Sequence, residues 1–545
     1  MIRTNEYNGP TVVEVRQNQP PTRRTHNLRL CLQITAAKGT LETGVLPKLR
    51  SLEAILQPIN RLPKDIFIRI PCFFTKKDYN VFPVNKPLIT MTHVCRSWRN
   101  VLLSTPSLWT QIDFSMSTNS QQAEGFLRRS GNQLLDIYQY LEDDDHIEPF
   151  LSTTLHNMFR LQRLSIISSL FRLKRLLENF STSGPELKVL EIENDANHTE
   201  MDIKLPKIFG GRLPKLTSLS LHHLRSNLRD FSFPSLTRFT FATGTKISVQ
   251  DLTSFFARCP SLEFIQICLS YTPQLPTAPP HRRVRLAALQ ELRFDQTACT
   301  TGLLDHLILP QCTEVMLKGQ FTGAVFDSYG SPAARIHPSS IDHLPITRGI
   351  TKAVAMPHSC VFSGPNGNLR FWCFDTTRRS FDAEFFTSFS PISVSEIREL
   401  WVGQDTTSYS GTRGRPWKQT AAGIHGAFGV LMKVEDLTVV SCETEPFFTT
   451  LGSTVDDGIL LPGLRRLTIY VGCGDLDVPA LIRCAKARKE HSRPLLEVTI
   501  VWEEELGADF VREVEPLREF VGELIYRIGE APMLSWKGED CHDVW

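Results

Sequence analysis

The sequence predicts an α/β fold: a short helical segment, then a long array of strand–loop–helix units, then a C-terminal capping helix. Three observations lead to this prediction. An apolar pattern of fixed spacing recurs through most of the chain after about residue 150, which indicates a parallel sheet backed by helices. A compact stretch with proline and tryptophan landmarks precedes it. The 545 residues, 41% hydrophobic and 22% charged, suffice for several domains or for one extended array.

The charges of the chain nearly balance, with 60 basic and 58 acidic side chains and a formal net charge of +2. This balance creates no global field for a polyanion, so we expect no nucleic-acid partner. No apolar stretch reaches the roughly 18 residues of a membrane span, and the N-terminus has no apolar signal segment, so we expect no membrane association. The thirteen cysteines include no Cys-x-x-Cys pair. They favour a reducing compartment, so we expect a cytoplasmic or nuclear protein.

The first 60 residues fall into two parts. Residues 1–44 are polar and interrupted by prolines, without a sustained apolar period, and predict a flexible leader. In residues 45–60 the side chains of Leu49, Leu52 and Leu56 recur at steps of three and four, which predicts an amphipathic helix. We expect this helix to pack against the rest of the protein.

Residues 61–114 predict a small helical domain, with helices at 64–70 and 88–103. Pro63 stands at the start of the first helix, where the missing N–H of proline costs nothing. Pro71 should end that helix about a turn early, because a proline inside a helix removes a hydrogen bond and clashes with the preceding turn.

After about residue 150 one template repeats: a proline, then apolar residues at the second, fifth and seventh positions after it. The template begins at Pro185, Pro214, Pro234, Pro260, Pro310 and Pro462. The same apolar spacing without the proline begins at Leu161, Leu289, Ile397, Val434 and Leu495. Together these matches predict eleven strands, and the steps between neighbouring units from Leu161 to Cys312 are 20 to 29 residues. Leucine-rich repeats have this strand pattern and a period of about 20–29 residues.

Residues 150–505 therefore predict an irregular leucine-rich-repeat solenoid, a parallel sheet backed by helices. The pattern lapses near 319–395, which we interpret as an insertion or a loop on the array. Residues 506–545 predict a capping helix and a tail, because an apolar stripe runs from Phe510 to Ile528 and the end of a stack must be covered. The alternative is an ordinary α/β domain whose leucines match the template by coincidence.

Side chains alternate across a strand, so the residues between the apolar positions should lie on the concave face of the sheet. This face is where we expect a protein substrate, with aromatic and arginine side chains as its anchors. The candidate substrate-binding residues are Arg238, Phe264, Gln266, Arg293, Trp401 and Tyr470. Four more residues occupy equivalent positions: Glu191, Ser220, Met316 and Thr468.

Three blocks follow one another within about fifty residues of the helical segment: Leu62-Pro63-x-Asp65-Ile66, Val94-Cys95-Arg96-x-Trp98-Arg99 and Ser104-Thr105-Pro106-Ser107-Leu108-Trp109. In this order they resemble an F-box. The stretch Phe126-Leu127-Arg128-Arg129-Ser130-Gly131 is similar to the continuation of the box in the fungal set of F-box proteins with degenerate leucine-rich repeats. Box and repeats together cover most of the chain after residue 45.

The resemblance implies a substrate-recognition subunit of an SCF-type ubiquitin ligase. In that family the box binds the Skp adaptor, and through it a cullin and a RING subunit, while the repeats hold the target protein. Carried over by position, the adaptor-facing residues are Leu62, Pro63, Ile66, Ile70, Val94, Cys95 and Trp98. Pro71 departs from the family, which usually continues its first helix there, and the loop after it is unusual.

We expect no catalytic residue, metal or cofactor. The sequence contains no nucleophile elbow, phosphate-binding loop, zinc helix or dinucleotide fingerprint. The pairs His93-x-Cys95 and His358-x-Cys360 lack a second pair at zinc spacing. The chain is thus expected to be a non-enzymatic adaptor. A repeat scaffold without ubiquitin-ligase association is the alternative, favoured by Pro71, and a hydrolase with an unrecognised nucleophile is a third reading.

Overall fold

The fold is that of a computed structural model of the 545-residue chain. The structure describes these residues: 62–74, 86–114, 120–141, 144, 147–195, 208–211, 213–224, 228, 231–243, 247–269, 283–295, 303–319, 344–356, 359–373, 394–403, 421–440, 444–455, 458–471, 476–502 and 508–529. The expected leader at 1–44 and the expected helix at 45–60 lie outside them.

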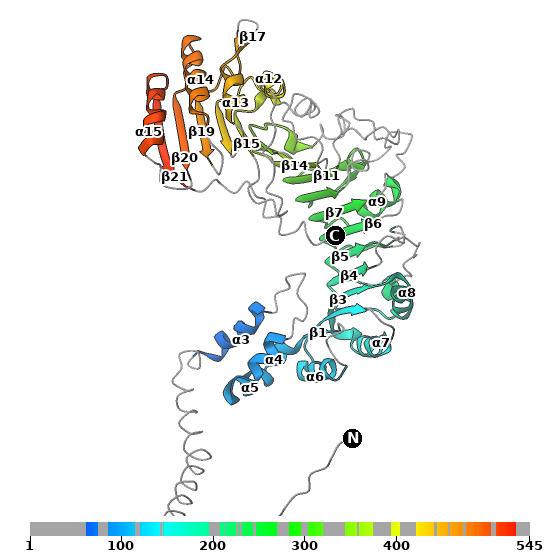
Figure 1. The fold of residues 1–545 in the computed structure, drawn as a ribbon. Helices are drawn as coiled ribbons and strands as arrows, with labels where there is room; N and C mark the ends of the chain where they lie inside the picture. Colours follow the sequence, from blue (N-terminus) through cyan, green and yellow to red (C-terminus); the bar gives the residue numbers. More distant parts are fainter. Residues whose placement is uncertain are drawn as a thin grey trace, which may run out of the picture.

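The helical segment lies at one end of the molecule (Figure 1). It consists of α3 (Lys64–Phe74), α4 (Lys86–Thr92), α5 (Arg96–Leu103) and the 3₁₀ turn η3 (Pro106–Trp109). The prediction of one helix over 88–103 is wrong, since the chain turns between α4 and α5. The reason lies at Cys95, whose backbone is extended (φ −155°, ψ 169°) and whose Sγ accepts a hydrogen bond from the Trp98 N–H as the N-cap of α5.

The expected early end of the first helix is also wrong. Helix α3 continues through Pro71 to Phe74. A proline removes one backbone N–H from a helix, but the helix can persist where tertiary packing holds it. Phe67 of α3 is buried, and Ile68 and Ile70 pack against the same core, so α3 is held by contacts before Pro71 is reached.

A seventeen-stranded sheet forms the body of the molecule. Its first nine strands pair in parallel, each with the next: β1 (Gln111–Asp113), β2 (Leu135–Leu141), β3 (Leu161–Ser168), β4 (Val189–Asn194), β5 (Ser218–His222), β6 (Arg238–Thr243), β7 (Phe264–Leu269), β9 (Glu291–Asp295) and β11 (Glu314–Gly319). Its last five are also parallel: β15 (Glu399–Gly403), β16 (Asp436–Val440), β19 (Arg466–Val471), β20 (Glu497–Trp502) and β21 (Glu523–Ile528).

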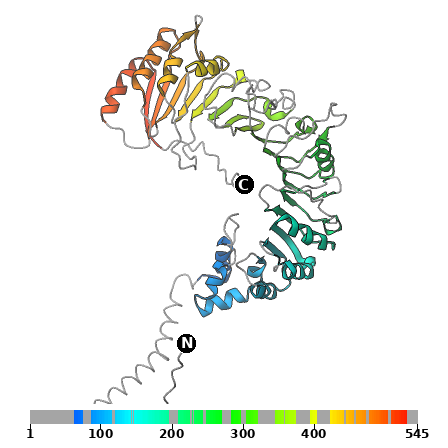
Figure 2. The ribbon, with the colours of Figure 1, turned by 45° about the vertical axis from the view of Figure 1, so that its right-hand side comes forward.

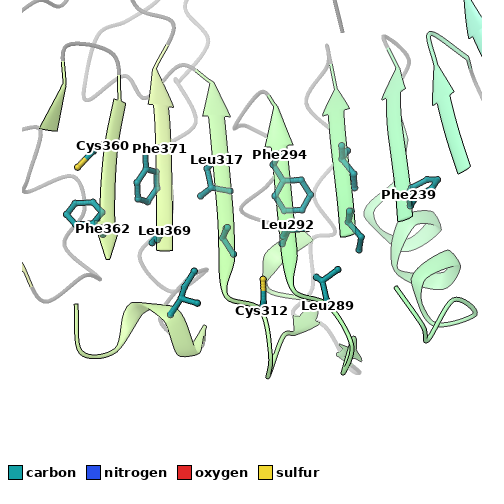
Figure 3. Close-up of a cluster of buried hydrophobic side chains, with 14 of the residues drawn as sticks. Phe239, Leu289, Leu292, Phe294, Cys312, Leu317, Cys360, Phe362, Leu369 and Phe371 are labelled. Atoms are coloured by element: carbon teal, nitrogen blue, oxygen red, sulfur yellow. The ribbon is translucent and has the colours of Figure 1, made fainter. Parts of the chain in front are cut away.

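All eleven strands predicted from the repeat template are strands of this sheet: β3, β4, β5, β6, β7, β9, β11, β15, β16, β19 and β20. The apolar residues of the template are the reason, because every one of them is at most 3% exposed. In β7, for example, Ile265 and Ile267 lie beside Leu292 and Phe294 of β9, and the same apolar rows continue into β11 (Figure 3). The protein is therefore a mixed α/β protein with a large, mostly parallel sheet.

Helices cover the outer side of this sheet, and its inner side faces the hollow of the arc that the molecule describes (Figure 2). The covering helices are α6 (Ser120–Ser130), α7 (Ile147–His156), α8 (Leu170–Asn179), α9 (Val249–Phe256), α12 (Ala421–Gly429), α13 (Thr444–Leu451) and α14 (Val478–Glu490). Side-chain N-caps begin two of them, since Ser248 Oγ accepts from Asp251 N and Asp477 Oδ1 accepts from Ala480 N.

Part of the segment at 319–395, where the repeat pattern lapses, lies inside the sheet. Strands β12 (Lys352–Met356), β13 (Ser359–Gly364) and β14 (Gly367–Cys373) form an antiparallel meander. Their order is reversed in space: β14 pairs with β11, and β12 pairs with β15, both in parallel. Only β13 runs against the rest of the sheet, so the meander joins its two halves without breaking the apolar rows (Figure 3).

The prediction of a capping helix from Phe510 to Ile528, interrupted by Pro516, is wrong beyond Val514. Helix α15 (Ala508–Val514) is followed by the 3₁₀ turn η11 (Glu515–Glu519) and then by β21. Pro516 cannot continue the α-helical hydrogen bonds. The edge of β20 offers unpaired backbone groups, which β21 satisfies, so a helix and a strand together cover this end of the sheet.

Candidate functional site

Three residues of the expected adaptor-facing set are exposed apolar side chains. Leu62, Ile66 and Val94 are 37%, 47% and 56% exposed. Ile66 belongs to α3, Leu62 lies two residues before the start of this helix, and Val94 lies in the turn between α4 and α5. Pro63 is exposed as well. We call Leu62, Ile66 and Val94 the helical apolar patch.

The other members of that set are partly buried. Trp98 lies against Phe67, with ring centroids 4.8 Å apart in an edge-to-face arrangement, and Ile70 packs against the same core. Cys95 is half-buried and caps α5 through its sulfur. Trp98 therefore joins α5 to α3, so its replacement would disturb the folding of the helical segment as well as its surface.

Trp109 packs in the interior of the protein. It is 2% exposed, its Nε1 donates a hydrogen bond of 2.9 Å to the Leu102 carbonyl, and its ring packs edge-to-face on Phe126 of α6. The guanidinium of Arg129 lies 4.9 Å from its ring centroid. These contacts tie η3 to α6, so they link the helical segment to the first unit of the sheet.

All ten residues that the alternation rule assigns to the inner side lie in three rows across the sheet. Glu191, Ser220, Gln266, Arg293 and Met316 belong to one row, in register with Thr240 between β5 and β7. Arg238 and Phe264 are neighbours in the adjacent row. Trp401 and Thr468 continue the first row in the far half, because the meander strands carry this row on from Met316. Tyr470 lies in a third row, two residues further along β19 than Thr468.

Phe264 is flanked by two guanidinium groups on this inner side. Arg238 lies 4.2 Å and Arg293 5.3 Å from the ring centroid. Arg293 also forms an ion pair with Glu291 of its own strand, at 2.5 Å. Two further ion pairs on this face join neighbouring strands, Arg163–Glu191 and Arg370–Glu314. Arg238 is exposed, and stacking on Phe264 holds its position.

The far half of the inner face contains a pocket of 320 Å³. Its walls combine two aromatic rings, three threonines and two charged side chains. The lining residues are Trp401, Thr438, Thr468, Tyr470, Glu497, Thr499, Val501, Arg527, Ile528 and Gly529. We call it the Tyr470 pocket. Its volume is at the lower end of the about 300–1,000 Å³ of ligand sites, which suits one side chain of a larger partner.

The two rings of the pocket are nearly parallel, with 27° between their planes and 6.5 Å between the centroids of Trp401 and Tyr470. On the β12 side, Lys352 Nζ lies 4.7 Å from the Trp401 centroid and 2.8 Å from Glu399 Oε1. Trp401 Nε1 donates to the same carboxylate oxygen at 2.6 Å. Burial acts to raise the pKa of Glu399, but the hydrogen bonds from Lys352 and Trp401 outweigh this effect, so the pKa of Glu399 is lowered.

The contacts of Trp401 with Lys352 and Glu399 fix the orientation of its ring. Sequence reasoning found Trp401, Thr468 and Tyr470 but missed the other lining residues. Thr438, Glu497 and Thr499 occupy alternating positions of strands that were predicted, so the same rule would have found them. Arg527 could not be found, because its strand β21 was predicted as helix.

Comparison of the chain with models of known protein families and with curated protein sequences finds no match. None of the helices in the described ranges is both long and apolar enough to cross a membrane. In the same residues, no three His, Cys, Asp or Glu side chains come together in a way that could hold a metal ion.

Proposed function

We propose that the protein is the substrate-recognition subunit of an SCF-type ubiquitin ligase. In this proposal residues 61–114 are an F-box that binds the Skp adaptor, and the sheet with its covering helices is a leucine-rich-repeat solenoid that binds a target protein. The chain is not itself an enzyme: it holds the target near a partner that transfers ubiquitin, so its contribution is proximity.

The helical apolar patch carries the proposal. The neighbouring apolar side chains Phe67, Leu88 and Leu102 are at most 5% exposed, so the helices have a core of their own, and the patch is not needed to build it. Three exposed apolar side chains within one small helical segment support a protein-binding surface there. A few such anchors supply most of the affinity of an interface. They are also the residues that resemble the adaptor-facing positions of an F-box.

The curved sheet supports the second half of the proposal. Its inner side is lined by charged, aromatic and hydroxyl side chains in regular rows, and in Figure 2 none of the helices in the described ranges covers it. A broad concave surface of this kind suits a protein partner, because many weakly contributing contacts can surround a few anchors. Trp401, Tyr470 and the Arg238–Phe264 pair are the residues of the type that anchors interfaces.

The alternative is a repeat scaffold that does not bind the Skp adaptor. Its main support in the sequence was Pro71, which was expected to shorten the first helix. Since α3 runs past Pro71 to Phe74, this feature no longer favours the scaffold. The two functions differ in one property, which is binding of the adaptor.

A pull-down of the Skp adaptor by the full chain tests the proposal. The variants are Ile66→Glu and Val94→Glu, which place a charge on the helical apolar patch without removing a buried side chain. Phe171→Glu is the matched control, because Phe171 of α8 is 73% exposed and lies outside the helical segment. The proposal predicts capture by the wild type and the control, and weak capture by the two patch variants. No capture by a folded wild type would overturn it.

A further inference from the structure

We propose that the Tyr470 pocket binds an arginine side chain of the target protein. This inference rests on the proposed function, because the ligand is part of a target protein. It goes further by naming the chemical group that the pocket recognises, a guanidinium. Three features of the pocket favour this ligand: its aromatic walls, its carboxylate Glu497 and the position of its own cation, Arg527.

The aromatic walls favour a cation. The negative faces of aromatic rings attract guanidinium and ammonium groups, and the planar guanidinium also stacks on them. The chain itself uses this attraction on the inner face, where Arg238 and Arg293 flank Phe264 and Lys352 lies over Trp401. Among the described residues no cation lies over Tyr470, although its ring borders the open pocket.

Glu497 supplies a carboxylate for the same cation. In the described part of the chain it takes part in no ion pair, and one hydrogen bond reaches it, 3.0 Å from the Thr499 hydroxyl to Oε1. A carboxylate can accept about four hydrogen bonds, so capacity for a two-pronged guanidinium contact is left. Its neighbour across the sheet, Arg466, forms its ion pair with Asp436, and the charge of Glu497 makes only a smaller contribution to the raised pKa of Arg466. Glu523 on the other side adds a second negative charge.

Arg527 sets the direction of the ligand. It lies beside Val501, four residues along β20 from Glu497, which is about 13 Å at the rise of a strand. The pocket therefore has a negative end at Glu497 and a positive end at Arg527. An arginine side chain entering it is repelled from the positive end and attracted to the negative one, with Tyr470 and the threonines Thr468 and Thr499 between them.

The probe for the test is N-acetyl-arginine methylamide, and the control ligand is N-acetyl-citrulline methylamide, which keeps the shape of the side chain but has no charge. Both are titrated into the full chain and followed by saturation-transfer NMR. We expect the arginine compound to bind at least tenfold more tightly than the citrulline compound. Glu497→Gln and Tyr470→Leu should each weaken its binding by at least fivefold, whereas Arg527→Gln should leave it unchanged or strengthen it.

Equal binding of the two compounds, or no saturable binding of the arginine compound to the folded wild type, would overturn the inference. So would unchanged binding by Glu497→Gln. The Ile66→Glu variant separates this result from the proposed function, since it should lose the Skp adaptor and still bind the arginine compound. If the compound binds but the wild type captures no adaptor, the pocket stands and the ubiquitin-ligase proposal falls.

Discussion

Arg488 Nη2 of α14 donates a hydrogen bond of 2.9 Å to the carbonyl oxygen of Leu461, a residue held at the positive φ of 46°. Nη1 donates to the preceding carbonyl of Leu460, also at 2.9 Å. The guanidinium is fully buried, and burial lowers the pKa of Arg488. A side chain on the outer side of the sheet thus holds the turn that leads into the neighbouring strand β19.

The same arrangement recurs elsewhere along the sheet. Arg258 donates to the carbonyls of Leu228 and Phe231, and Arg160 donates to the carbonyls of Gly131 and Gln133. In each case the arginine lies 27 to 30 residues after its acceptors, which is close to the sequence distance between paired residues of neighbouring parallel strands such as β4 and β5. The guanidinium fork suits this task because it donates to two carbonyls at once.

Replacement of Arg488 by methionine should lower the free energy of unfolding by about 2–4 kcal/mol, because two buried carbonyls lose their donors. Urea unfolding followed by circular dichroism measures the change. The matched control is Arg512→Met, whose side chain is 79% exposed and forms only an exposed pair with Asp509. Equal stability of the Arg488 variant and the wild type would show that the arginine does not hold the turn.

Gly367, at φ 129° where β14 begins, should not tolerate alanine. A Cβ atom there would overlap the Thr313 carbonyl oxygen of the turn before β11, and the backbone angle disfavours any L side chain. Gly367→Ala should cost more than about 2 kcal/mol of unfolding free energy. Gly429→Ala at the end of α12 meets nothing within 4 Å and should change stability by less than about 1 kcal/mol. Similar thermal unfolding of both variants would contradict this account of the meander.

The stability of the protein should fall as the pH is lowered through the titration of His222. Burial lowers the pKa of this half-buried imidazole from 6.5 to about 4, the charge of His223 adds to the effect, and Glu191 opposes it. Ser220 Oγ lies 2.6 Å from its Nε2. An unfolded histidine takes up a proton below pH 6.5, whereas the folded one stays neutral until about pH 4. The contribution of His222 is therefore complete above pH 6.5 and is lost as the pH falls toward 4.

The expected loss is about 1–3 kcal/mol between these limits. Urea unfolding measured at intervals from pH 4.5 to 7.5 gives the slope. The variant His222→Gln should flatten it between pH 5 and 6.5, and the control His156→Gln, at an exposed position of α7, should leave it as in the wild type. An unchanged slope in His222→Gln would refute the assignment.

The parts of the fold that the sequence predicted are those governed by apolar spacing. In each predicted strand, apolar positions alternate with polar ones after a helical or turn segment. Two examples are the pairs Leu190–Ile192 and Leu467–Ile469, and both pairs are buried in the sheet. The rule contains no information on strand order. For that reason the reversed meander of β12, β13 and β14 was not foreseen, since its pairing depends on which strand edges remain free.

The errors in the helices have local causes. Whether Pro71 ends a helix depends on the contacts of Phe67 and Ile70, which the sequence does not reveal. The stretch from Phe510 to Ile528 has a helical apolar period, but its last part also alternates as a strand does, as at Leu524 and Tyr526. Pairing with the free edge of β20 favours the strand there. The candidate site was predicted in part, because alternation places Trp401 and Tyr470 on the inner face while Arg527 depended on that strand.

The central claim is that the helical segment binds the Skp adaptor. Its most direct test is calorimetric titration of purified adaptor into the full wild-type chain, with Ile66→Glu and Phe171→Glu measured in parallel. Saturable one-to-one binding by the wild type and Phe171→Glu, weakened at least tenfold in a folded Ile66→Glu variant, is the predicted result. Absence of binding to the folded wild-type chain, or equal binding by all three proteins, would contradict the claim.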